Sequence, residues 1–176
     1  MAISEEDTHP EVASELEKRL DDNLTVESGK RIEYTLEYDS DKEVKSRSFE
    51  TDVCVLKNGV PQVILEVKRK KATTHDLRVY STKAETHKQV YPYLQYGMLV
   101  LEAKNTMTKR YIWHGEDFDF LYFSEKEMES AEDLDSEKMD ELADIIENNI
   151  QKGQKLKDIN DGKRKPKAFD RELKLK

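Results

Sequence analysis

Three residues near the middle of the chain have the types and spacing suited to phosphodiester chemistry: Asp52, Glu66 and Lys68. Two carboxylates that converge on one point can hold a hard divalent cation through oxygen. Such a cation polarises a phosphoryl oxygen and lets a bound water ionise near neutral pH. Because side chains alternate along a strand, Lys68 projects on the same side as Glu66. Its ammonium can there orient the water or offset the charge that grows on the phosphate.

Sequence context separates this set from other pairs with the same spacing. Glu66 lies inside the apolar run Val63–Val67, where an unpaired carboxylate is costly. A structural salt bridge from Glu66 to Lys68 or Arg69 is the alternative explanation, but a metal accounts better for a second acid at Asp52. Glu-x-Lys occurs three more times, at Glu43/Lys45, Glu102/Lys104 and Glu172/Lys174. None of these has an aspartate on an adjoining hairpin strand.

The segment that carries the three residues predicts a β-hairpin. Two short apolar runs, Phe49–Leu56 and Pro61–Val67, flank Asn58 and Gly59. Asn-Gly between two such runs is a strong signal for a tight hairpin turn. The second run is apolar on both faces apart from its glutamate, which indicates a central strand.

The pairing register of this hairpin decides whether the two acids can share an ion. A regular two-residue turn places Asp52 opposite Leu65, which puts Asp52 and Glu66 on opposite faces of the sheet. A three-residue loop over 57–59, or an equivalent one-residue bulge, brings them to the same face. We therefore predict one of these two, with positive φ at Gly59.

The chain has 176 residues, a formal net charge of −8, 39% charged residues and 36% hydrophobic residues. This length suits one domain with a lean core, and we expect a domain over 1–153 followed by a basic tail or linker over 154–176. The sequence shows no apolar run long enough to span a membrane and no signal-peptide pattern after Met1. Cys54 is the only cysteine, so it forms no internal disulfide. These features predict a cytoplasmic protein.

Periodicity and capping signals predict a mixed α/β sandwich. Thr8 with Glu11 has the pattern of a capping box at the start of the first helix. A basic, irregular connection, Arg69–Tyr80, follows the hairpin, and Gly153 is expected to stop the last helix. The remaining expected elements are the helices Thr8–Leu24, Thr82–Gln95 and Ser136–Gln151, and the strands Arg31–Tyr38, Gly97–Ala103, Tyr111–Trp113 and Phe118–Phe123.

Basic side chains concentrate around the candidate acids. Residues 53–111 carry 11 basic and 4 acidic side chains within an acidic chain. This pattern suits a track for DNA phosphates, although a solvated surface has the same composition. Gln89 and Tyr93, four residues apart on an expected helix, share one face and can support the site or bind the DNA backbone. The residues of the track are Lys68, Arg69, Lys70, Lys71, Arg78, Lys83 and Lys88.

Signatures of other chemistries are missing from the sequence. It contains neither a phosphate-binding GxxxxGK[ST] loop nor a Gly-x-Ser-x-Gly nucleophile motif. Its four histidines lack metal-ligand spacing, and Cys54 has no cysteine partner for zinc. The acid–lysine set is thus the best candidate for a site.

The stretch from Asp52 to Lys68 resembles the PD-(D/E)xK nucleases. More narrowly, it is similar to the N-terminal nuclease domain of the restriction subunit of type I restriction–modification enzymes. In that family an aspartate opens a strand, an Asn-Gly-x-Pro turn follows, and an apolar strand carries Glu-x-Lys. Asn58, Gly59 and Pro61 match the turn, and Gln89 and Tyr93 match a downstream Gln-x-x-x-Tyr helix. The resemblance covers roughly residues 5–123, with Thr51 in place of the proline before Asp52.

This resemblance implies a restriction-endonuclease-like core, with a mixed β-sheet flanked by helices, and a Mg²⁺-dependent or Mn²⁺-dependent DNA endonuclease. Asp52, Glu66 and the backbone carbonyl of Val67 would bind the ion, and Lys68 would position or activate the water. Gln89 and Tyr93 would support the site or the DNA strand. Members of the family often have a glutamate near the first helix as well; Glu5, Glu11 and Glu15 compete for this place, and the sequence assigns none of them.

The expected partners are double-stranded DNA and other subunits of a restriction–modification complex. The chain is then either part of a longer motor-containing subunit or a stand-alone relative. One alternative is a non-catalytic nucleic-acid-binding module that keeps the nuclease fold. Another is a protein-interaction domain built on the acidic segment 112–151.

Overall fold

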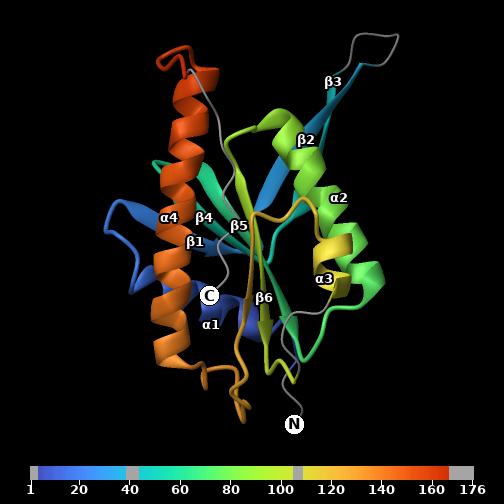
Figure 1. The fold of residues 1–176 in the computed structure, drawn as a ribbon, viewed down its shortest axis with the longest axis vertical. Coiled ribbons are helices and arrows are strands. Elements are labelled where there is room, and N and C mark those ends of the chain that lie inside the picture. Colours follow the sequence, from blue (N-terminus) through green and yellow to red (C-terminus); the bar gives the residue numbers. More distant parts are fainter. Residues whose placement is uncertain (1–3, 39–43, 105–108, 167–176) are drawn as a thin grey trace.

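The computed structural model describes residues 4–38, 44–104 and 109–166, apart from the side chains of residues 35–46. A five-stranded mixed sheet forms its centre, in the order β1-β4-β5-β6-β7 (Figure 1). β1, β4 and β5 pair antiparallel, whereas β5, β6 and β7 pair parallel. The strands are β1 (Leu24–Ser28), β4 (Val53–Lys57), β5 (Val60–Arg69), β6 (Gln95–Leu101) and β7 (Phe120–Phe123).

Helices cover both faces of this sheet, which confirms the predicted α/β class. The helices are α1 (Thr8–Glu17), α2 (Thr74–Val90), α3 (Lys109–His114) and α4 (Ser136–Asn160). Val53 and Leu65 pack with α1 and α4 on one face, while Cys54 and Ile64 pack with Ala84 of α2 on the other. Figure 1 shows α4 and α2 on opposite sides of the sheet. Because side chains alternate along β5, the residue two positions after Ile64, which is Glu66, faces α2.

A separate two-stranded ribbon, β2 (Arg31–Tyr38) and β3 (Val44–Glu50), lies between β1 and β4 in the chain and extends away from the body (Figure 1). Its base is fixed to α2 by aromatic contacts. Tyr34 stacks on Phe49 at 4.2 Å between ring centroids, and the His87 ring lies edge-on to both. The ribbon is thus anchored just before the strand that begins after Asp52.

The first helix is shorter than predicted and is capped differently. It ends at Glu17, and a turn in which the Leu24 N–H donates to the Asp21 carbonyl at 2.8 Å starts β1. The predicted Thr8–Glu11 capping box does not form: the N-cap is Asp7, and its side chain makes no cap hydrogen bond to the helix. In the turn before α1, Ser4 and Asp7 each accept the other's backbone N–H through their side chains, both at 3.1 Å. The turn that they enclose places Glu5 ahead of the helix.

The second helix begins earlier and ends earlier than the predicted Thr82–Gln95. Thr73 and Asp76 form a capping box inside the segment predicted to be irregular, because each side chain accepts the other's backbone N–H. The helix ends at Val90, and Pro92 lies just beyond it. Tyr93 is therefore outside the helix, and the prediction that it shares a helical face with Gln89 is wrong.

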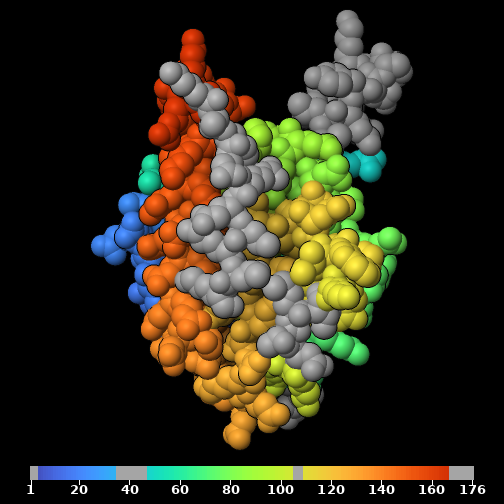
Figure 2. Space-filling view, viewed as in Figure 1, coloured from blue at the N-terminus to red at the C-terminus, as the bar shows by residue number. Residues whose placement is uncertain are grey.

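Two predictions near the C-terminus are also wrong. The expected strand Tyr111–Trp113 lies in α3, and α4 continues through Gly153 to Asn160 instead of stopping. Figure 2 shows α4, in orange and red, along the length of one side. The start of the predicted tail is thus the end of α4. Residues 167–176 lie outside the described part, and the division between 1–153 and 154–176 stays a prediction.

Gly153 serves close packing in this helix. A Cβ atom at this position would lie 2.5 Å from the carbonyl oxygen of Tyr93, a backbone atom that cannot swing away. We expect Gly153→Ala to lower the free energy of unfolding by roughly 1–3 kcal/mol through overpacking. At an open helix position the same change stabilises by about 1 kcal/mol. Urea unfolding of the variant beside exposed Lys152→Ala measures the difference, and a Gly153→Ala protein more stable than the parent would contradict the close contact.

Candidate active site

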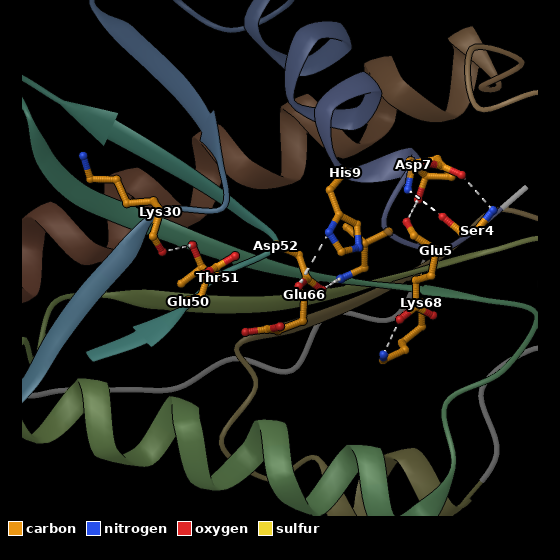
Figure 3. Close-up of polar contacts among 12 residues, drawn as sticks. Ser4, Glu5, Asp7, His9, Lys30, Glu50, Thr51, Asp52, Glu66 and Lys68 are labelled. Atoms are coloured by element: carbon orange, nitrogen blue, oxygen red, sulfur yellow. Dashed lines mark hydrogen bonds and ion pairs between the residues drawn. The ribbon is translucent and has the colours of Figure 1, made fainter. Parts of the chain in front are cut away.

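The turn of the central hairpin is a regular two-residue turn, followed by a bulge. Asn58 and Gly59 both have positive φ, 52° and 74°. The cross-strand partners are Leu56 with Pro61 and then Val55 with Val63, so β5 carries one extra residue, Gln62. This is the one-residue bulge that the sequence required as the equivalent of a three-residue loop. Val53 consequently pairs with Leu65. The next position back, Asp52, therefore lies on the same face as Glu66, and Figure 3 shows the two side by side.

Hydrogen bonds to backbone groups hold both the side chain of Asp52 and the residue before it. Its Oδ2 accepts the N–H of Val67 at 2.8 Å, which ties it to the strand that carries Glu66. Its Oδ1 lies 3.8 Å from Nδ1 of His9. The preceding Thr51 donates both its N–H and its hydroxyl to the carbonyl of Lys30, each at 2.9 Å (Figure 3). A proline at position 51 would have no N–H, so Thr51 makes a backbone hydrogen bond here that proline could not make.

Glu66 is 0% exposed, and its two oxygens have different surroundings. Oε1 accepts hydrogen bonds from Nζ of Lys83 at 2.9 Å and from the Tyr96 hydroxyl at 3.1 Å. Oε2 is buried and has no hydrogen-bond partner among the described residues. Burial, and then the charge of Asp52, raises the pKa of Glu66 to about 7 against the opposing effect of Lys83 and Tyr96. The cation that pairs with Glu66 is thus Lys83, whereas the salt-bridge alternative proposed Lys68 or Arg69.

Lys68 instead pairs with Glu5 of the N-terminal turn. Its Nζ donates to Oε1 of Glu5, and Oε2 of Glu5 accepts the backbone N–H of Arg69 at 3.2 Å (Figure 3). Burial lowers the pKa of Lys68, but the hydrogen bonds to Glu5 and Tyr80 outweigh burial and raise it, so the side chain is an ammonium at neutral pH. Glu5 is therefore the N-terminal glutamate that contacts the set, while Glu15 pairs with Lys18 and Arg19 on the surface of α1.

From α2, Lys83 bonds Glu66, Tyr80 lies beside both lysines, and His87 reaches the set through Tyr96. Both lysine ammonium groups lie over the Tyr80 ring, Lys68 at 5.0 Å and Lys83 at 5.1 Å from its centroid. The buried His87 lies 3.3 Å from the Tyr96 hydroxyl through Nδ1 and 3.3 Å from the Ile32 carbonyl through Nε2. Lys83 and His87 are thus four residues apart on α2, which is the spacing predicted to matter for Gln89 and Tyr93.

Gln89 and Tyr93 lie elsewhere. Gln89 is exposed on α2, and the ring of Tyr93 lies 5.0 Å from Nζ of Lys157 on α4. Neither contacts Asp52 or Glu66 in the described structure, although their contact with DNA stays a prediction. The same four-residue spacing occurs at Lys83 and His87, which lie beside the buried residues of α2, and Lys83 bonds Glu66. Spacing alone does not distinguish the two pairs.

The donor atoms at this site suit a hard cation that keeps some of its water. Within the described residues, no group of three or more His, Cys, Asp or Glu side chains gathers closely enough to enclose a metal. Within the part of the chain that the structure describes, Oδ1 of Asp52 and Oε2 of Glu66 accept no hydrogen bond, and Nδ1 of His9 lies 3.8 Å from Oδ1. Mg²⁺ is typically bound through one or two carboxylates plus water. The residues therefore fit Mg²⁺ better than a metal that needs a full protein cage.

The mixed sheet and the acid–lysine hairpin define a PD-(D/E)xK nuclease-like domain. The chain belongs to the family described as Type I restriction enzyme R protein N terminus, whose sequence model matches residues 4–112. This match confirms the resemblance inferred from the hairpin. It spans α1 through β6, including every residue placed at the site above. No curated protein matches the chain. None of the helices in the described part of the chain is long and apolar enough to cross a membrane.

The raised pKa of Glu66 has a measurable effect on stability. Its carboxyl holds a proton more tightly in the folded protein than at its ordinary pKa of 4.5, so the metal-free fold loses stability as the pH rises from about 4.5 to about 7. The loss is roughly 3 kcal/mol at most. Asp52→Asn removes the second cause of the shift and should shrink the loss. Urea unfolding of parent and Asp52→Asn between pH 4.5 and pH 8 measures this, and a larger loss in Asp52→Asn would refute it.

Proposed function

We propose that this domain is a Mg²⁺-dependent DNA endonuclease, the cleavage domain of a restriction–modification system. The observation that carries the proposal is the bulge at Gln62, which brings Asp52 and Glu66 to one face beside Lys68. A buried carboxylate oxygen without a donor, Oε2 of Glu66, adds support because such an atom is costly unless a ligand completes it. Mn²⁺ suits the same oxygen donors.

The site residues have two roles, which are binding the ion and stabilising charge on the phosphate. Oδ1 of Asp52, Oε2 of Glu66 and the carbonyl of Val67 would hold the ion. When bound, it supplies Lewis-acid polarisation of a phosphoryl oxygen and a more acidic water. Hydrolysis would join a water oxygen to phosphorus and break one P–O bond of the DNA backbone, with a proton of the water passing to the leaving oxygen. Lys68 offsets the negative charge that develops on the phosphoryl oxygens.

Lys68 acts as a cation in this scheme and not as a base. Its pKa is raised by the hydrogen bonds to Glu5 and Tyr80, so it holds its proton at neutral pH. Glu5 fixes the ammonium on the face it shares with Glu66 and bonds the next backbone N–H as well. Glu5 is thus a positioning residue that keeps Lys68 directed along the site.

We propose duplex DNA in the cytoplasm as the substrate, with other restriction–modification subunits as partners. The basic residues of β5 and α2 and the segment between them suit phosphate contacts. No base-reading element is evident in the described residues. Phosphate contacts position a protein but carry little sequence information, so partner subunits would supply sequence choice.

Cleavage of supercoiled plasmid tests the proposal. We expect nicking with Mg²⁺ and none with EDTA. Asp52→Asn, Glu66→Gln and Lys68→Met should each reduce the rate by roughly a hundredfold or more, since each removes charge at the phosphate or the ion. Glu85→Gln, exposed on the same α2 helix, is the matched control and should cleave like the parent. Cleavage that survives Glu66→Gln would place the chemistry elsewhere.

A non-catalytic DNA-binding module is the second candidate. The observation in its favour is that a lysine side chain already occupies one oxygen of Glu66, at 2.9 Å. Such a module would shift DNA in a gel at low salt, yet leave the plasmid intact with Mg²⁺ or Mn²⁺ at any concentration. Binding without nicking would therefore select this candidate over the nuclease.

A further inference from the structure

Lys83 is the least expected charged group at the site. It reaches the acids from α2, its side chain is 12% exposed, and it donates to Oε1 of Glu66 and to the carbonyl of Glu50, both at 2.9 Å. Glu50 lies two residues before Asp52. One ammonium therefore holds both the buried glutamate and the backbone that leads into the other acid.

The carboxylate oxygens of the site are almost fully used by the protein. Both oxygens of Glu5 are occupied, by Lys68 and by the Arg69 N–H. Oδ2 of Asp52 accepts the Val67 N–H. Oε1 of Glu66 is occupied by Lys83 and by a tyrosine hydroxyl. Within the described structure this leaves Oε2 of Glu66, which has no partner, and Oδ1 of Asp52, which has His9 at 3.8 Å.

We propose that Lys83 is a positioning residue that takes up Oε1 of Glu66, so that the site binds a single divalent ion through Oε2 of Glu66 and Oδ1 of Asp52. The inference rests on the proposed nuclease function and specifies its metal site. Lys83 and Lys68 together supply the positive charge that a second ion would otherwise bring to the phosphate.

The charges of the set agree with one ion. With Glu66 ionised, as an ion bound to its Oε2 requires, three carboxylates, on Glu5, Asp52 and Glu66, and two ammonium groups, on Lys68 and Lys83, leave one net negative charge. One divalent ion changes this to one net positive charge, which balances one DNA phosphodiester. A second ion would leave three positive charges, and among the described residues it would have to share a carboxylate oxygen that already accepts a hydrogen bond. At Glu66 it would compete with Lys83 for Oε1, and removing one partner from a buried ion pair is costly.

Counting bound Mn²⁺ tests the proposal directly. The parent should bind one Mn²⁺ per chain in a calorimetric titration, with or without uncleavable phosphorothioate DNA. Lys83→Met leaves only a tyrosine hydroxyl to orient Glu66, so its Mn²⁺ affinity should fall roughly 10–100-fold, as when other groups that orient ligands are removed. Lys83→Arg keeps a cation and N–H donors near Oε1 and should recover most of the affinity.

Lys126→Met is the matched control. Lys126 also donates to a carboxylate, that of Asp133, and to a backbone carbonyl, that of Leu134, but it follows the site residues in the sequence and contacts none of them in the described structure. This variant should bind Mn²⁺ like the parent. Two ions in the parent, or unchanged or tighter binding in Lys83→Met, would overturn the inference, even if the parent cleaves DNA. A parent that binds no Mn²⁺ at millimolar concentration would overturn both this inference and the metal-dependent nuclease. Should Lys83→Met fail to fold, the ion count of the parent and the affinity of Lys83→Arg still decide.

Discussion

A fully buried carboxylate requires compensation, and much of this domain is arranged around that requirement at Glu66. Lys83 and Tyr96 reach it from α2 and β6, two elements that come after it in the chain. His87 extends the polar contacts from Tyr96 to the base of the β2–β3 ribbon. One acidic residue thus links the centre of the sheet, its covering helix and the ribbon. Among the described residues Oε2 has no hydrogen-bond partner, and the proposed metal site rests on this gap.

The second constraint is the bulge at Gln62. Val60 and Pro61 pair with Lys57 and Leu56 as a two-residue turn requires, and the ladder then skips Gln62 and resumes with Val55 opposite Val63. The Asn-Gly turn and the bulge that follows it therefore do more than reverse the chain. They set the phase of the strand that carries Glu66 relative to Asp52.

The sequence was sufficient for the hairpin because its signals are local. Turn chemistry at Asn58 and Gly59, alternation along two strands and the position of an acid in an apolar run all act within a few residues. The same reasoning could not select Glu5 over Glu11 or Glu15, since that choice depends on where the Ser4–Asp7 turn meets β5 in space.

The helix α2 shows the other limit. Its start depends on a capping box at Thr73 and Asp76 within a segment whose composition indicates a loop. Because α2 begins at Thr74 and ends at Val90, it presents Lys83 to Glu66, while Tyr93 lies beyond its end. Helical spacing alone cannot say which of two similar pairs turns inward, because tertiary packing makes that choice. Tertiary packing also explains Gly153, which the sequence indicated as the end of the last helix. The helix continues through it, and the nearby carbonyl of Tyr93 leaves no room for a side chain.

The ion pair between Lys83 and Glu66 also bears on how such a domain can change over evolutionary time. Replacing both partners of a buried pair by apolar side chains of similar volume is often neutral or stabilising, whereas losing one partner is costly. A lineage released from selection for cleavage would therefore tend to lose the two residues together, with its sheet, helices and basic surface intact. Descendants of that kind would remain well-folded proteins, and the joint absence of this lysine and this glutamate would mark them in a set of related sequences.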